Sequence, residues 1–156
     1  MSDHNKLFLY TPLLEVGGYP STCPFNTHRA GQTRRIVESM GLLAGNGRRE
    51  IEPVALTNEE LSRFHTASYL DGLRKAGMGL LDPDDALWTG LGTMDCPIFE
   101  NMYDYVSLAA GGSVTGAHRI IRGDASLVFN PSGGFHHAQP DHASGFCYIN
   151  DVVLAA

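Results

Sequence analysis

The segment ASLVFNPSGGFHH, residues 125–137, joins the clearest strand of the sequence to a loop that has no periodicity. Leu127, Val128 and Phe129 form a short apolar run of the kind that favours a buried strand. The loop continues to Asp151 and holds three histidines and one cysteine. Functional sites of open α/β sheets form at the carboxyl ends of strands, so we expect a site in this loop.

Strand-like and helix-like segments alternate along the rest of the chain. This order argues for a parallel sheet that is covered by helices. Between Gly77 and Asp95 the alternation fails, and glycines, a proline and acidic residues predict a long loop. The sequence predicts strands over 6–10, 50–56 and 125–130, and helices over 30–43, 59–65, 66–77, 97–123 and 151–156.

Polar residues mark where three of these helices begin. Thr57 and Glu60 form a capping box, in which the hydroxyl accepts a hydrogen bond from a helix N–H and the carboxylate reaches back. Thr66 is placed to start the next helix. Asn150 or Asp151 is expected to cap the last helix.

Two helix segments carry a pattern that predicts their packing. Ile36, Val37 and Met40 form one apolar stripe between charged residues, which is typical of a helix face that turns toward the core. The segment AAGGSVTGA, residues 109–117, has almost no side-chain bulk. We therefore expect this part of its helix to pack closely against another element.

Composition predicts one soluble domain spanning residues 1–156. A hydrophobic fraction of 43% suffices for a core. The net charge of −6 and the scattered Lys and Arg residues argue against direct nucleic-acid binding. The polar start, Met1 to Lys6, lacks the apolar run of a signal peptide, and no apolar stretch is long enough to cross a membrane. Three cysteines without CxxC spacing indicate reduced thiols, so a cytoplasmic location is expected.

The histidines of the loop allow several interpretations. In an irregular loop the adjacent rings of His136 and His137 can converge on one substrate atom, where one takes a proton and the other stabilises charge. They could equally be two polar loop residues. A zinc site that adds His142 fits no standard ligand spacing, and His142 is expected to solvate a loop tip. Cys147, between two aromatic residues, is expected to be a buried apolar side chain and not a nucleophile.

Four segments closely resemble the histone deacetylase superfamily, which includes acetoin-utilisation proteins and acetylpolyamine amidohydrolases. The longest is GGFHHAQPDHASGFCYINDVVLAA, residues 133–156, whose sequence resembles the class I and acetoin-utilisation branches more than the polyamine branch. The resemblance implies a three-layer α/β/α arginase-deacetylase fold with a parallel sheet, of which this chain is the N-terminal part. It also implies zinc-dependent hydrolysis of an acetyl amide, such as acetyl-lysine or a related acetylated amine. The other segments occur in the family's order and are CPFNTHR (23–29), RFHTASYLDGLR (63–74) and DCPIFENMYDYVSLAAGGSV (95–114).

By motif position, the resemblance assigns roles to residues of the loop. In the family the metal polarises the acetyl carbonyl and activates a water, while the histidine pair handles protons. His137 matches the general base and acid, and His136 matches its electrostatic partner beside the water. Gly145 and Phe146 match the walls of the narrow tunnel for the acetyl-lysine stem, where an aromatic face suits a methylene chain.

Three further positions match the rim and the interior of the family's site. Asp95 matches the rim aspartate that accepts hydrogen bonds from the substrate backbone. Arg29 and Gly134 match an internal cavity below the metal. Without the resemblance, Asp95 would be assigned as the cap of a helix after Pro97, and Arg29 as a surface charge. The chain departs from many members at Cys23, where they have histidine, so rim contacts and specificity are expected to differ.

In the family, the metal ligands and the acidic partners of the histidines follow the helix that begins at Asn150. No metal is therefore expected to be held by residues 1–156 alone, and the chain is expected to be inactive by itself. The preferred hypothesis is an N-terminal portion of a deacetylase that a C-terminal chain completes. The alternatives are a non-catalytic module that binds a partner or itself through an open sheet edge, and a small metal-binding protein that uses the three histidines. An unfinished sheet is expected to expose apolar surface and to associate.

Overall fold

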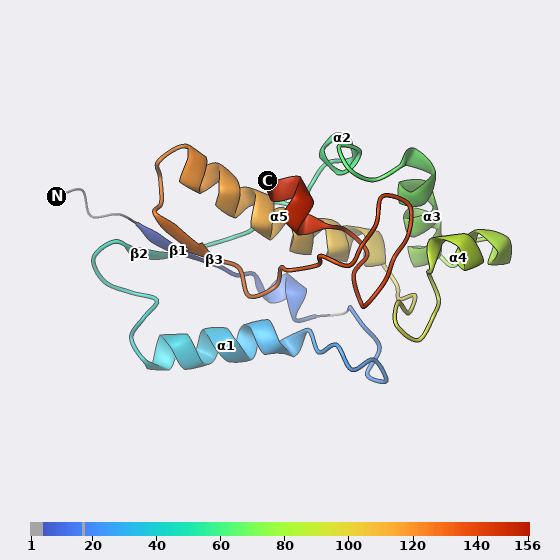
Figure 1. Ribbon diagram of the computed structural model, residues 1–156. Coiled ribbons are helices and arrows are strands. Elements are labelled where there is room, and N and C mark those ends of the chain that lie inside the picture. Colours follow the sequence, from blue (N-terminus) through green and yellow to red (C-terminus); the bar gives the residue numbers. More distant parts are fainter. Residues whose placement is uncertain (1–4, 17) are drawn as a thin grey trace.

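The fold contains a parallel sheet of three strands, in the order β2 (Arg48–Ile51), β1 (Lys6–Leu9), β3 (Leu127–Phe129). This is a computed structural model that describes residues 5–16 and 18–156 (Figure 1). The predicted parallel sheet is confirmed, with Leu7 opposite Arg49 on one side and Val128 on the other. Along the chain, the helices are a 3-10 turn (Pro12–Leu14), α1 (His28–Ser39), α2 (Asn58–Leu61), α3 (Ala67–Gly77), α4 (Pro83–Thr89), α5 (Met102–Ile121) and α6 (Asp151–Ala155).

Helices lie on both sides of the sheet. Figure 1 shows α5 running along one side and α1 along the other. The face toward α5 carries Leu9 and Val128, since a Cβ placed on Gly116 of α5 would lie 2.9 Å from Cγ1 of Val128. Phe8 and Phe129 are on the opposite face, with their ring centroids 5.5 Å apart.

The glycine-rich centre of α5 packs closely against its neighbours, as its composition predicts. A Cβ on Gly111 would lie 1.9 Å from the carbonyl oxygen of Val54, and one on Gly112 would lie 2.6 Å from Nδ2 of Asn130. Real Cβ atoms do not approach this closely, so only glycine allows the backbone contact. The segment after β2 and the residue after β3 therefore sit directly on α5.

The stripe on α1 does not face the core. The expectation for Ile36, Val37 and Met40 is wrong, because Ile36 and Met40 are exposed and only Val37 is half-buried. Val37 lines an apolar groove between α1 and the sheet, together with Leu42 and Phe129. In this region, an open apolar groove lies between the helix and the sheet.

Two predicted boundaries also differ. The strand predicted over 50–56 lies at 48–51, because Pro53 has no N–H for the ladder and Val54 N–H donates to Oγ1 of Thr115 instead. The helix predicted from Pro97 begins at Met102, since the carbonyl of Pro97 accepts a hydrogen bond from the hydroxyl of Tyr148 at 2.6 Å.

The predicted loop over 77–95 contains the helix α4, which the sequence analysis missed. Its signals are standard ones: the side chain of Asp82 accepts a hydrogen bond from Asp84 N–H, and Pro83 is the first helical residue. Gly90 ends the helix in the left-handed conformation, with φ of 70°.

The predicted helix caps are confirmed. Thr57 and Glu60 form both hydrogen bonds of the capping box, and Thr66 accepts a hydrogen bond from Tyr69 N–H at 3.3 Å. Asn150 caps α6 by accepting one from Val153 N–H. The polar start, Met1 to Lys6, falls mostly outside the described residues. No helix in the described part of the chain is long and apolar enough to cross a membrane.

The close contact of α5 yields a test of stability. Gly111→Ala is expected to lower the free energy of unfolding by about 1–3 kcal/mol, because the new methyl group meets the backbone of Val54. Gly72→Ala in α3 is the matched control: its methyl group would make only ordinary contacts, the nearest at 3.6 Å. Helix propensity predicts a gain of about 0.5–1 kcal/mol for the control. Urea unfolding followed by circular dichroism measures both, and equal stability of the two variants would contradict the close packing.

Candidate functional site

The histidine pair lies in the loop that leaves the carboxyl end of β3. The rings of His136 and His137 have centroids 4.2 Å apart at an angle of 39°, and both side chains are exposed. Nδ1 of His136 is 2.9 Å from the carbonyl oxygen of Gly134, which only accepts, so Nδ1 carries the proton and Nε2 is free to accept one. The two rings thus lie side by side on one short piece of backbone, and their joint action on one substrate atom stays a prediction.

A buried carboxylate holds the backbone just before the pair. Asp151 is 0% exposed, and its side chain accepts hydrogen bonds from Gly134 N–H at 2.9 Å and from Phe135 N–H at 2.6 Å. The hydroxyl of Ser113 in α5 donates to the same carboxylate, and Nδ2 of Asn130 donates to that hydroxyl at 3.0 Å. Hydrogen bonds around this one carboxylate therefore connect three elements: the end of β3, the middle of α5 and the start of α6.

Asn150 holds the backbone on the other side of the pair. Its Nδ2 donates to the carbonyl of Ala138 at 2.9 Å and contacts the carbonyl of His136 at 3.4 Å. Its backbone N–H donates to Nε2 of the buried His65 at 3.0 Å. The loop is consequently fixed from both ends of the pair by adjacent residues at the start of α6.

Gly145 and Phe146 lie beside the pair. A Cβ on Gly145 would be 3.0 Å from the ring of His137, so the backbone contacts this ring directly. Phe146 has φ of 65°, a conformation that is rare for a bulky residue and often marks functional sites. Its N–H donates to the carbonyl of Asp95 at 3.1 Å, and its carbonyl accepts a hydrogen bond from the hydroxyl of Tyr19. These two contacts hold the backbone of Phe146, whose ring is predicted to wall the tunnel.

Asp95 therefore meets this site through its backbone, while its side chain is exposed. The alternative role of Asp95 as a helix cap is wrong, because the next helix begins at Met102. With Thr93 and His142, Asp95 lines a surface pocket of about 370 Å³. The position is consistent with the rim role that the resemblance implies.

Arg29 lines a cavity of about 110 Å³ that also contacts Phe135 and Gly133. Its neighbour in the predicted set, Gly134, has φ of 98° and uses its N–H to bind Asp151. The cavity thus lies directly behind the histidine-pair loop. The predicted use of Arg29 and Gly134 in an internal cavity stays a prediction, which this geometry supports for Arg29.

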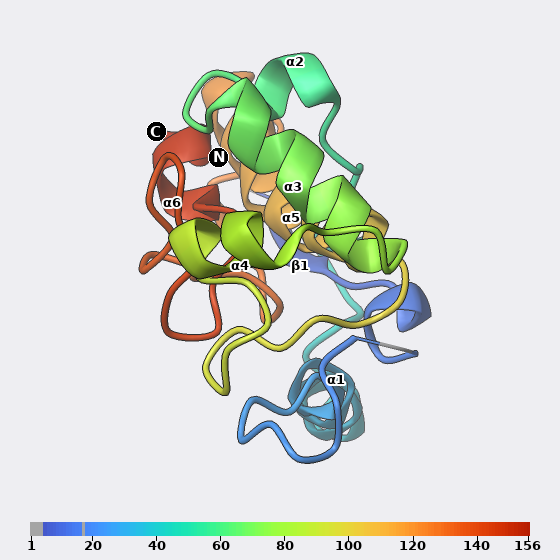
Figure 2. The same ribbon diagram turned by 90° about the vertical axis from the view of Figure 1, so that its right-hand side faces the viewer.

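His142 does more than solvate a loop tip, so that expectation is wrong. Its Nδ1 donates to the carbonyl of Trp88 at 2.8 Å, and Ala143 N–H donates to the carbonyl of Thr89 at 2.8 Å. Both carbonyls belong to the last turn of α4, and Figure 2 shows this helix beside the loop. The left-handed Gly90 is required here, because a Cβ would lie 2.5 Å from the carbonyl oxygen of Ala143.

The cysteines match their predicted state. Cys23, Cys96 and Cys147 are free, and Cys147 is buried as expected. Burial raises the pKa of the Cys147 thiol above its usual value and that of Cys96 to about 11. A buried thiol that stays protonated at neutral pH is a poor nucleophile.

No group of three or more His, Cys, Asp or Glu side chains that could hold a metal ion occurs within residues 5–16 and 18–156. His136, His137 and His142 do not converge, because His142 is tied to α4. A catalytic zinc requires about three protein ligands in fixed geometry. The described residues alone therefore do not fit a zinc ion.

Sequence reasoning missed the residues that support the site. Asp151 is expected from its position only as a possible cap, and nothing in its local sequence points to Gly134 and Phe135. Tyr19 and His65 lie far from the loop along the chain. Only the support from α4 had a signal in the sequence: the run Asp82–Asp84 is a normal start for a helix, and this helix supplies the carbonyl that His142 contacts.

Comparison with known proteins identifies the family of this chain. The profile of the histone deacetylase domain matches residues 23–156. The chain is 42% identical over 127 residues to Histone deacetylase 8 of Xenopus tropicalis, a match that covers 81% of this chain and 34% of that protein. It is 33% identical over 151 residues to the acetoin utilization protein AcuC of Bacillus subtilis, covering 97% of this chain and 38% of that protein.

Solved structures agree with this placement. The crystal structure of a histone deacetylase homologue from Aquifex aeolicus superimposes with a TM-score of 0.85 at 30% identity. A second structure, described as a histone deacetylase homologue in complex with SAHA, gives a TM-score of 0.84. Each match covers 97% of this chain and 40% of the other. The predicted α/β fold of the arginase-deacetylase type is confirmed for the part that is present, and the chain spans less than half the length of these relatives.

The buried carboxylate behind the pair can be tested directly. Asp151→Asn is expected to lower the free energy of unfolding by about 1–3 kcal/mol, because the amide NH₂ would replace one of the two oxygens and would face the N–H of Gly134 or of Phe135, which then loses its acceptor. The exposed Asp141 of the same loop provides the control, and Asp141→Asn should leave stability within about 0.5 kcal/mol of the parent. Urea unfolding measures both. A fully stable Asp151→Asn variant would show that this carboxylate does not hold the loop.

Proposed function

Because the chain belongs to the histone deacetylase family, we propose that its histidine-pair loop supplies the proton-transfer part of a deacetylase active site. The proposed reaction is hydrolysis of an acetyl amide, with acetyl-lysine or a related acetylated amine as the substrate. The observation that carries the proposal is the pair itself: His136 and His137 stand exposed at the carboxyl end of β3 with their rings 4.2 Å apart. The order of residues and the fold of the relatives support the same assignment.

The roles of the two rings are those that the family resemblance implies, and the contact of His136 with Gly134 supports its part. Water adds to the acetyl carbonyl, and His137 takes the proton that the water loses. When the C–N bond breaks, His137 returns this proton to the leaving amine, so that acetic acid and the free amine are formed, and the second proton of the water stays on the acid until it ionises to acetate. His136 has its proton fixed on Nδ1 by the carbonyl of Gly134, and its Nε2 stabilises the charge that develops beside His137.

The neighbouring residues would bind the substrate. Gly145 lets the backbone approach the ring of His137, and the ring of Phe146, whose backbone is held by Asp95, would offer an apolar face to a methylene chain. The carboxylate of Asp95, which is exposed, would accept hydrogen bonds from a substrate backbone at the rim. Arg29 would meet acetate in the cavity behind the loop.

Zinc would polarise the acetyl carbonyl in such a site, but the described residues do not provide its ligands. We therefore place the ligands in a segment that corresponds to the rest of the deacetylase domain of the relatives. The contribution of this chain is the histidine pair, the tunnel wall and the rim.

This division of the site predicts the outcome of a complementation experiment. The chain is mixed with the part of the Aquifex aeolicus homologue that it does not match, and zinc per chain and hydrolysis of an acetyl-lysine peptide are measured. We expect zinc and turnover in the mixture and neither in the chain alone. His137→Ala should lower the rate at least about 100-fold, since a positioned acid-base group contributes roughly 10²–10⁴-fold.

His118 provides the matched control, because it is exposed on α5 and outside the proposed site. His118→Ala should keep the parent rate. One zinc ion held by the chain alone after exhaustive dialysis would contradict the placement of the ligands elsewhere. Turnover by the His137→Ala variant at the parent rate would contradict the role of the pair.

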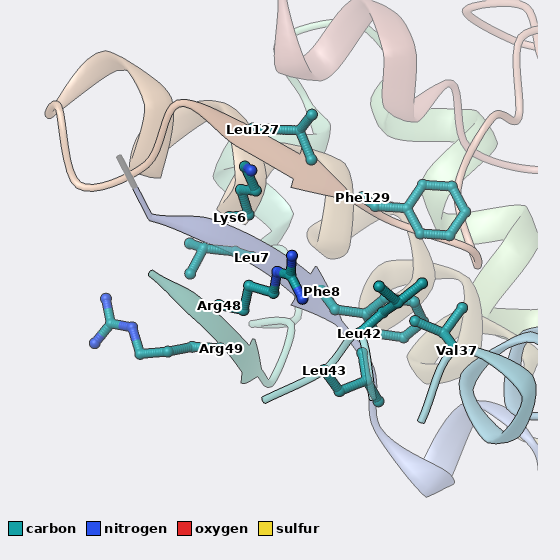
Figure 3. Close-up of a pocket in the computed structure, with 10 residues that line it drawn as sticks. All are labelled: Lys6, Leu7, Phe8, Val37, Leu42, Leu43, Arg48, Arg49, Leu127 and Phe129. Atoms are coloured by element: carbon teal, nitrogen blue, oxygen red, sulfur yellow. The ribbon is translucent and has the colours of Figure 1, made fainter. Parts of the chain in front are cut away.

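A second proposal concerns a partner chain, and the open side of the sheet favours it. Leu127 and Phe129 of the edge strand β3 are 52% and 47% exposed. They line a groove of about 310 Å³ that also contains Phe8, Val37 and Leu42 (Figure 3). An exposed apolar edge strand is a template for pairing with another strand. We propose that a second copy of this chain covers this edge when the chain is alone.

Association through β3 has a direct test. Leu127→Glu should raise the monomer fraction in sedimentation velocity, because a charge on the open face of β3 disfavours an apolar contact. Leu87→Glu is the control, since Leu87 is also exposed but lies on α4 and does not line the groove. A chain that is wholly monomeric before substitution, or an equal effect of both variants, would argue against this interface.

A further inference from the structure

His65 is a buried titratable group that the proposed chemistry does not use. It lies between α2 and α3, is 2% exposed, and has its ring stacked on Tyr69 with the centroids 5.4 Å apart. Phe64 contacts the same ring edge-on at 4.9 Å. Histidines are rarely so fully enclosed without a role for the ring nitrogens.

The contacts of His65 lead to the histidine-pair loop. Its Nε2 accepts a hydrogen bond from Asn150 N–H at 3.0 Å. The side chain of Asn150 then donates to the carbonyl of Ala138 and contacts that of His136. Thr66, the residue after His65, donates its N–H to the carbonyl of Pro140 at 2.9 Å, so a second contact joins the same two segments.

We propose that His65 is a positioning residue that holds the His136–His137 loop in place through Asn150. Because a backbone N–H only donates, Nε2 of His65 must be unprotonated, and the neutral ring carries its proton on Nδ1. Among the described residues, Nδ1 has no hydrogen-bond partner of good geometry. The ring is therefore held in one tautomer by the single bond to Asn150. The positioning itself stands on these contacts, and only its consequence for catalysis rests on the proposed function.

Protonation of His65 would break this arrangement. A second proton on Nε2 removes the acceptor of Asn150 N–H and leaves a charge in an apolar site. Burial lowers the pKa of His65 below its usual value, and the carbonyls of Pro140 and Gln139 oppose this effect. These carbonyls are the polar groups that act on the ring, and the hydroxyl of Tyr69 is engaged with the carbonyl of Tyr148.

The direction of the pH effect follows from the lowered pKa. The unfolded chain takes up a proton on His65 near pH 6.5, while the folded chain takes it up only at lower pH. The contribution of His65 to stability is therefore complete above about pH 6.5 and is lost as the pH falls toward the folded pKa. The loop should loosen over the same range.

The tautomer can be measured in the unaltered chain. Uniform ¹⁵N labelling and long-range ¹H–¹⁵N spectra at pH 7.5 should show His65 with a bare Nε2 and a protonated Nδ1. A ring with its proton on Nε2, or one already charged at this pH, would overturn the proposal. This measurement requires no variant and no activity.

Two variants then separate positioning from packing. His65→Phe keeps a ring against Tyr69 but has no acceptor, and it should lower the hydrogen-exchange protection of Asn150 N–H at least tenfold and shift the amide signals of residues 136–138. His65→Gln offers an acceptor oxygen and should restore part of that protection, without the loss that the parent shows between pH 7.5 and 5.5. His118→Phe is the control and should change none of these signals.

Parent-like protection of Asn150 in His65→Phe would overturn the proposal. If the NMR results are as expected and the completed enzyme shows no deacetylation, the positioning stands and the proposed function fails. If deacetylation is found, His65→Phe should lower kcat with little change in KM, since His65 lies away from the proposed substrate groups.

Discussion

The carboxylate of Asp151 is the interaction on which the rest of this site depends. It is buried completely, and it receives hydrogen bonds from the backbone before the histidine pair and from Ser113 in α5. A buried charge is tolerated only where donors surround it, so the glycine-rich turn cannot leave this carboxylate without a large cost. An irregular loop, which has no ladder or helix of its own, obtains its fixed shape in this way.

The remaining supports of the loop come from segments that are distant in sequence. The hydroxyl of Tyr19 and the carbonyl of Asp95 hold Phe146 in a conformation that a phenylalanine does not adopt freely. At the end of α4, the carbonyl of Trp88 accepts a hydrogen bond from the side chain of His142. Nε2 of His65 accepts one from Asn150 N–H. None of these contacts uses the side chain of His136 or His137, so Nε2 of His136 and the ring of His137 remain available for substrate. Such preorganisation is what a proton-transfer site requires.

Much of this arrangement could be predicted from the sequence, and the rest could not for physical reasons. Local signals were sufficient for the caps at Thr57 and Thr66, for the strand of β3 and for the close packing of the glycines in α5. The face of α1 could not be predicted, because an apolar stripe does not say whether a partner covers it, and Ile36 remains exposed. The loop of His136 and His137 could be predicted as a site from its place after a strand, and the separate roles of the two histidines came only from the resemblance. Asp151 and His65 act through contacts between distant segments, for which periodicity carries no signal.

The pairing of β1 with both neighbours has a consequence for how the chain folds during synthesis. Lys6 pairs with Arg48 on one side but with Leu127 on the other. The first strand leaves the ribosome long before its second neighbour exists, at roughly 5–20 residues per second. During that interval the apolar side chains of Leu7, Phe8 and Leu9 have only one strand beside them. The early chain is therefore expected to be a natural client of chaperones, which would shield this strand until β3 arrives.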